Sequence, residues 1–189
     1  MPYWKLRLVF MKALYSNLKR WWTAVAFVVS GAMLGAAHAF ERFGGLDPCN
    51  LCLKQREVYW AALAVSGAAT VWHLISRSRR GTPRLAAFVL ALVFITGAIT
   101  AGFHAGGEQK WWALPATCSA GNPLDVDLSN LAGILDGTVE VAPITGCGDI
   151  PWSFLGLSMA AWNFVVSLAL AIMSLVAAKR PKDARAPRK

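Results

Sequence analysis

Charged side chains are scarce in this sequence, and their scarcity excludes an ordinary soluble protein. Only 15% of the 189 residues are charged, whereas 56% are hydrophobic and the mean hydropathy is +0.45. A soluble domain carries about a quarter of its residues as charged side chains. We therefore reject a large soluble helical core, because the uncharged runs are long enough to cross a bilayer.

Acidic and basic side chains are absent from four long stretches of the chain. Each stretch is close to the roughly 20 residues that a membrane-spanning helix needs, and aromatic residues gather near the ends, as they do at membrane interfaces. The stretches cover residues of about 21–40, 58–75, 85–103 and 152–178. The predicted fold class is an all-α membrane protein, a bundle of four transmembrane helices within residues 21–178.

Acidic residues are also nearly missing from three hydrophilic segments, and this asymmetry predicts the orientation. The segments before the first run, between the second and third, and after the fourth are basic, with Asp183 as their one acid. They belong in the cytoplasm by the positive-inside rule, and the loops 41–57 and 104–151 belong outside. The net charge of +9 thus follows topology and does not indicate a nucleic-acid partner.

Both termini are therefore predicted to be cytoplasmic. The basic segment 1–20 fits either an amphipathic helix on the inner leaflet or a disordered arm, and 179–189 reads as an unfolded basic tail. The basic start, the first run and Ala37-His38-Ala39 also mimic a cleavable secretory signal. Because that run exceeds a usual signal core and follows a long basic segment, we expect it to remain as a span.

Cysteine is absent from the spans and from the inner segments. The chain has four cysteines, Cys49, Cys52, Cys118 and Cys147, and all lie in the two outer loops. Disulfides persist in an oxidising compartment outside an inner membrane. Four cysteines allow three pairings, and the local one joins Cys49 to Cys52 and leaves Cys118 for Cys147. A Cys49–Cys147 exchange product is equally allowed by the sequence.

The Cys-x-x-Cys pair favours redox chemistry over a structural staple, because so short a bridge constrains little. In a helix from Cys49 onward, Cys52 and Arg56 would share one stripe, and a guanidinium near a thiol favours the thiolate. A zinc site is disfavoured by the loose cysteine spacing and the oxidising side. Leu53, not histidine, follows the pair, which excludes c-type haem attachment. We predict no metal.

Together these motifs resemble the DsbB-type disulfide-bond oxidoreductases of bacterial inner membranes. The resemblance covers about residues 21–178 and is specific because two cysteine pairs occur with the four-span topology. The residues that carry it are Cys49-Asn50-Leu51-Cys52 with Arg56, His104 at the end of the third run, Trp111 to Cys118, Cys147, and Asp149 to Met159.

The resemblance implies a multi-pass protein of the inner membrane with its active site on the periplasmic side. A periplasmic DsbA-like oxidase of thioredoxin fold would be re-oxidised by the Cys118–Cys147 bridge, with Cys118 attacked first. Cys147 would then exchange with Cys49, and Cys52 would face a membrane quinone, ubiquinone or menaquinone. Such a quinone is needed because a DsbA-like oxidant sits near −120 mV, above the thiol pools.

The resemblance further implies that Arg56 and His104 lie at the quinone. Arg56 is also a functional candidate in its own right, since an arginine at the membrane edge is costly unless paired or snorkelling. The other two histidines, His38 and His73, are expected to be interfacial residues near the ends of their runs.

Two other functions compete with this interpretation. A vitamin-K-epoxide-reductase-like quinone reductase shares the four-helix plan, but its quinone-facing Cys-x-x-Cys follows the loop cysteines, whereas here it precedes them. A non-enzymatic membrane scaffold would use the bridges as staples, the longer one contributing about 3–4 kcal/mol. Loss of quinone reduction in Cys52→Ser would separate an enzyme from such a scaffold.

Overall fold

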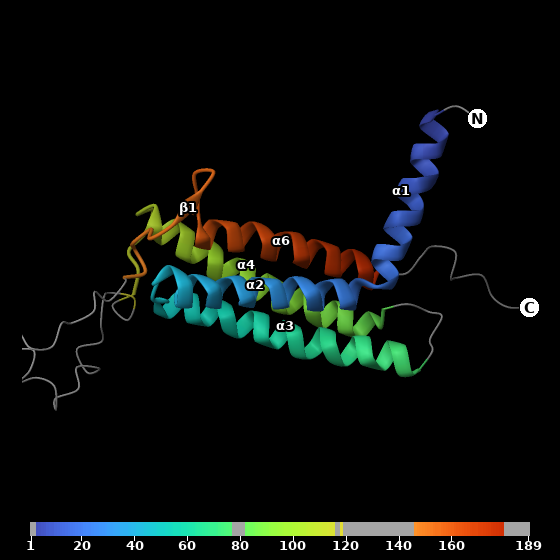
Figure 1. The fold of residues 1–189 in the computed structure, drawn as a ribbon, viewed down its shortest axis with the longest axis horizontal. Helices are drawn as coiled ribbons and strands as arrows, with labels where there is room; N and C mark the ends of the chain where they lie inside the picture. The colour runs from blue at the N-terminus through green and yellow to red at the C-terminus, as the bar shows by residue number, and fades with distance from the viewer. Residues whose placement is uncertain (1–2, 77–81, 116–117, 119–145, 180–189) are drawn as a thin grey trace, which may run out of the picture.

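Four long helices form a single bundle in the computed structural model (Figure 1), which describes residues 3–76, 82–115, 118 and 146–179. They are α2 (Trp22–Gly44), α3 (Asn50–Ile75), α4 (Arg84–Glu108) and α6 (Met159–Ala178), and each is long and apolar enough to cross a membrane. Helix α4 packs against α6 and α3, and α2 packs against α3. The all-α, four-span fold class is thus confirmed, while its orientation in a membrane stays a prediction.

Three of the helices are longer than the uncharged runs from which they were expected. Helix α2 continues four residues past Phe40 to Gly44, α3 begins at Asn50, eight residues before the run 58–75, and α4 continues five residues past Phe103 to Glu108. Polar and charged side chains occupy these extensions, so a reading based on hydrophobicity ends the spans too early. As a result Cys52, Arg56 and His104 lie on rigid helices rather than on loops.

Small side chains dominate the interior of the bundle. Phe94 and Leu90 are the largest fully buried residues, and most of the others are alanines and serines. Small residues let helix backbones approach closely, which is how helices associate where no water drives them together. The buried indole of Trp22 donates to the Ser174 hydroxyl at 2.9 Å, tying α2 to α6.

A short hairpin precedes α6 at the end of the bundle that carries the cysteines, here called the cysteine end. Strands β1 (Ser153–Phe154) and β2 (Leu157–Ser158) pair antiparallel through Leu155 and Gly156, both at positive φ (52° and 78°). The Ser158 hydroxyl then caps α6 by accepting from the amide of Ala161 at 3.1 Å. The hairpin therefore fixes where α6 begins.

Helix α1 (Tyr3–Arg20) leaves the opposite end of the bundle at an angle (Figure 1). This is the helical alternative of the two that the sequence allowed for segment 1–20. Tyr3, Trp4 and Phe10 are exposed on it. The basic tail, apart from Lys179, and residues 119–145 of the second loop lie outside the described residues.

Candidate functional site

The Cys-x-x-Cys pair opens helix α3. Cys49 is the N-cap residue, and its sulfur accepts a hydrogen bond from the backbone amide of Cys52 at 3.3 Å. Side chains at an N-cap normally supply oxygen for this role, so the first cysteine replaces the usual serine or aspartate. The two sulfurs lie 3.0 Å apart, farther than the roughly 2.05 Å of a disulfide bond. They are thus arranged as a dithiol able to close into a bridge.

The second cysteine pair lies against the first. The backbone amide of Cys147 donates to the carbonyl of Cys118 at 3.0 Å, which holds two segments of the second loop together. Cys49, Cys118 and Cys147 are all buried in one apolar cluster, closed by Leu51, Cys52 and Leu114. Four cysteine side chains, two from the start of α3 and two from the second outer loop, therefore meet at one place.

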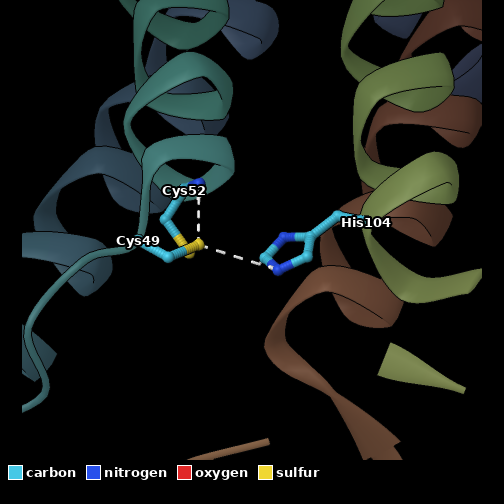
Figure 2. A group of neighbouring side chains, drawn as sticks. All are labelled: Cys49, Cys52 and His104. Atoms are coloured by element: carbon cyan, nitrogen blue, oxygen red, sulfur yellow. Dashed lines mark hydrogen bonds between the residues drawn. The ribbon is translucent and has the colours of Figure 1, made fainter. Parts of the chain in front are cut away.

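His104 stands between the two pairs. Its Nε2 atom lies 3.7 Å from the Cys49 sulfur and 3.1 Å from the carbonyl oxygen of Cys147. Figure 2 shows the imidazole on α4 facing the sulfurs of Cys49 and Cys52 at the start of α3. Sequence reasoning assigned His104 to the quinone. In the structure its imidazole contacts Cys49 and Cys147.

Burial and hydrogen bonding keep two of the thiols protonated. The pKa of Cys49 is raised to about 12, chiefly because its thiol is hydrogen-bonded to Cys52 and also because it is buried, with His104 opposing the shift. Burial likewise raises the pKa of the Cys147 thiol. A thiol of this kind is a poor nucleophile at neutral pH until a neighbour removes or shares its proton.

A chain of buried polar side chains runs from His104 into the bundle. Gln55 on α3 lies 2.9 Å from Nδ1 of His104, and its amide oxygen accepts from the amide of Asn163 on α6. The Asn163 oxygen accepts in turn from the hydroxyls of Tyr59 at 2.6 Å and Ser167 at 3.2 Å. Sequence reasoning missed this chain. The available signal was an asparagine inside an otherwise apolar span, since polar residues there are costly.

Glu108 extends the polar site at the last turn of α4. One carboxyl oxygen accepts from the Ser158 hydroxyl, and the other lies 3.8 Å from Nε2 of His104. The sequence reading placed Glu108 in the outer loop 104–151. Here Glu108 is buried and connects His104 to the start of α6.

Arg56 is held by helix α2 and not by a thiol. Its guanidinium donates to the carboxylate of Glu41 at 2.5 Å and to the carbonyl of Ala37 at 3.2 Å. The expected pairing with the Cys52 sulfur is therefore replaced by an ion pair that the sequence reading missed. His38 lies 3.6 Å from the same Glu41, and His73 packs edge-on against Trp21 at the other end of the bundle.

A cavity of about 420 Å³ opens beside the cysteines. Its lining is mainly apolar, with Met33, Leu34 and Phe40 among the lining residues, and it also includes Cys52 and Arg56. His104 and Gln55 line the cavity as well. Ligand cavities of this size are typically apolar with a few convergent polar groups. The predicted site residues Cys49, Cys52, Arg56 and His104 all lie along it, while Cys118 and Cys147 lie behind Cys49.

Three potential ligands of a soft metal also meet here. The donor atoms of Cys49, Cys52 and His104 lie within 4.8 Å of one another. A structural zinc site takes four ligands, and the Nε2 atom that would bind the metal faces an obligate acceptor, the Cys147 carbonyl. Because Nε2 then carries a proton, the arrangement favours thiol chemistry. The absence of a resident metal stays a prediction.

Comparisons with known proteins agree with the fold and the cysteine pattern. A family model described as Disulfide bond formation protein DsbB matches residues 19–177. The chain is similar to proteins named Disulfide bond formation protein B from three bacteria. It is 29% identical to that of Aromatoleum aromaticum over 82% of this chain and 90% of the relative, and 32% identical to that of Methylococcus capsulatus over 80% and 89%. The protein of Marinobacter nauticus is 29% identical over 87% and 96%.

Proposed function

The chain belongs to the DsbB family of disulfide bond formation proteins, and we propose that it is a thiol:quinone oxidoreductase of a bacterial inner membrane. It re-oxidises a periplasmic DsbA-like oxidase of thioredoxin fold and passes two electrons to a membrane quinone. The active site faces the periplasm, and both termini face the cytoplasm.

One observation carries this proposal: the four cysteines converge beside an apolar cavity at one end of a four-span bundle. A scaffold needs no contact between its two staples. An enzyme that moves electrons by thiol–disulfide exchange needs the sulfurs of both pairs within reach, since each step is a direct attack of one sulfur on another.

The first exchange takes place at the outer pair. A thiolate of the reduced partner attacks Cys118 in the Cys118–Cys147 bridge, forming a mixed disulfide and releasing Cys147 as a thiolate. The partner's second thiolate then breaks the mixed disulfide and leaves oxidised. Two electrons and two protons have passed from the partner to Cys118 and Cys147.

The second exchange passes these electrons inward. The Cys147 thiolate attacks Cys49 in the Cys49–Cys52 bridge, and Cys52 leaves as a thiolate. Cys118 then attacks Cys147, which restores the outer bridge and frees Cys49. The contact of Cys49 with Cys147 in one buried cluster supports this order.

The cavity fits a quinone by its chemistry. A quinone is an apolar molecule with two carbonyl acceptors, and the mainly apolar lining of this cavity includes Cys52, Arg56 and His104. When bound it accepts two electrons and two protons, and the Cys49–Cys52 bridge is regenerated. Arg56 would hold the ring end through its guanidinium while Glu41 fixes that group, and the side chains of Met33 and Phe40 would exclude water.

The test is quinone reduction by a reduced DsbA-like partner in membranes or detergent. Wild-type protein should consume one quinone for each partner disulfide formed, and Cys52→Ser should abolish both. Cys118→Ala should lose turnover with the partner yet keep reduction driven by a small dithiol, which reacts with Cys49–Cys52 directly. Full partner oxidation by Cys52→Ser would favour the scaffold. The vitamin-K-epoxide-reductase-like alternative predicts reduction of a quinone epoxide, which a DsbB-type enzyme should not show.

A further inference from the structure

The buried side-chain amides of Gln55 and Asn163, which are hydrogen-bonded to His104 and to each other, have no part in the exchange steps above. The donor and the acceptor of each of their hydrogen bonds can be assigned. We infer that Gln55 and Asn163 are positioning residues that fix the tautomer of His104, so that its Nε2–H is held at the Cys147 carbonyl and beside the exchanging sulfur of Cys49. This inference rests on the proposed function and adds two residues to its site.

The assignment of donors and acceptors begins at the Cys147 carbonyl. A carbonyl oxygen can only accept, so at 3.1 Å the Nε2 atom of His104 must carry a hydrogen. In a neutral imidazole the other nitrogen, Nδ1, is then an acceptor and needs a donor. The NH₂ group of Gln55 lies 2.9 Å from it and is buried, so it fills that role.

Asn163 holds Gln55 in the donating orientation. The Asn163 NH₂ group donates to the Gln55 oxygen, which leaves the Gln55 NH₂ group to face His104. The Asn163 oxygen is fixed by the hydroxyl of Tyr59 at 2.6 Å. Each side-chain nitrogen and oxygen of Gln55 and Asn163 has a hydrogen-bond partner, and reversing one amide would set two like groups against each other. A satisfied buried network of this kind specifies a single arrangement.

The result is a fixed N–H of His104 beside the Cys49 sulfur. Nε2 lies 3.7 Å from the Cys49 sulfur, and in thiol–disulfide exchange negative charge spreads over the reacting sulfurs. A donor held in place before the reaction stabilises such charge without reorganisation. Glu108, 3.8 Å from Nε2, is the one carboxylate near this N–H among the described residues, and the Ser158 hydroxyl occupies its other oxygen.

The tautomer can be measured directly, because the chain has only three histidines. The experiment uses the full-length, reduced protein labelled with ¹⁵N-histidine in detergent or lipid, with His104→Gln identifying the His104 signals. Wild type should show neutral His104 with its proton on Nε2. Gln55→Leu should give a mixture of tautomers, and Gln55→Glu, which places an acceptor at Nδ1, should draw a proton onto that nitrogen.

Two further variants complete the test. Asn163→Leu keeps a similar volume, removes the group that orients Gln55 and should also mix the tautomers, which provides a second reading where Gln55→Leu fails to fold. Ser66→Ala is the matched control. Ser66 is buried on the same helix, but its hydroxyl bonds to its own helix at Ala62, so the His104 signals should not change.

Turnover gives the second readout. Gln55→Leu and Asn163→Leu should lower kcat with the reduced partner about tenfold, the usual effect of losing one positioned hydrogen bond. A proton on Nδ1 of wild-type His104, or unchanged His104 signals in both leucine variants, would overturn the inference. A wild type that shows the Nε2–H tautomer but no quinone reduction would instead overturn the proposed function, so the two failures differ.

Discussion

Cys49 has two tasks at the head of α3. Its sulfur caps the helix by accepting from the Cys52 amide, and its thiol is hydrogen-bonded to the Cys52 sulfur. These contacts and burial raise the pKa of Cys49 to about 12. Because the pKa of Cys49 is raised, its thiol keeps its proton at neutral pH. The reactive thiolate forms only in strong alkali, as the pH approaches that value.

Alkylation measures this protection. In the reduced protein at pH 8, Cys49 should react with iodoacetamide about a hundred- to a thousandfold more slowly than an unperturbed cysteine, because a rise of one pKa unit removes nine-tenths of the thiolate. The rate should increase about tenfold per pH unit up to about pH 12. Cys52→Ala removes the principal cause of the shift and should speed the reaction of Cys49. Equal rates in both proteins would contradict this explanation of the shift.

Arg56 offers a second test at a single residue. Its guanidinium bonds both Glu41 and the Ala37 carbonyl, a geometry that the single ammonium of lysine cannot reproduce. We expect Arg56→Lys to raise the KM for quinone about tenfold, as for the loss of one hydrogen bond to a charged group. Lys54 lies on a different face of α3, where it is exposed and pairs with Glu57. Lys54→Arg is therefore the control and should leave the KM for quinone unchanged. An unchanged KM for quinone in Arg56→Lys would contradict a role of Arg56 in quinone binding.

The sequence predicted the residue types of the site better than their contacts. The four cysteines, Arg56 and His104 were found from spacing and resemblance, and the cysteines do converge. The partner of Arg56 was wrong, because Glu41 lies 15 residues away on another helix and nothing in local spacing marks it. Asn163 stood in view inside the last span, but its partner Gln55 is 108 residues distant, so only the fold joins them.

At the scale of elements, two glycines near the end of α4 let the following loop fold back over the helix. A Cβ on Gly106 would overlap the ring of Trp112, and one on Gly107 would overlap the side chain of Leu114. Leu114 packs against the cysteine cluster, and the same loop leads to Cys118. The two glycines therefore leave the room that Leu114 needs to pack against the cysteine cluster. The sequence reading ended this span at Phe103.

This close packing predicts the effect of one added methyl group. Gly107→Ala should displace Leu114 and loosen the cysteine cluster, lowering partner-dependent turnover about tenfold or more, since a shift of about 1 Å at a reacting group can cost that much. Gly35→Ala on α2 is the matched control, because no atom lies within 4 Å of its added Cβ. Equal turnover of the two variants would show that the loop does not depend on Gly107.

At the scale of the whole molecule, the proposed orientation puts the cysteine end outside the cytoplasm. The helical bundle alone does not determine which end faces the cytoplasm. The orientation therefore rests on the basic segments at the end opposite the cysteines. Alkaline phosphatase fused after Gly148 should be active, since the enzyme needs an oxidising compartment, and the same fusion after Arg80 should be inactive. The reverse pattern of activity would show that the protein has the opposite orientation, with its cysteines on the cytoplasmic side.

The central claim is that the two cysteine pairs exchange through Cys49 and Cys147. The double variant Cys52→Ala, Cys118→Ala leaves these two sulfurs without their other partners, in a cluster where both are buried together. Peptide mapping by mass spectrometry of the variant from oxidised membranes, after blocking of thiols, measures the outcome. The account predicts one Cys49–Cys147 disulfide in nearly all molecules, whereas two blocked, separate thiols would contradict it.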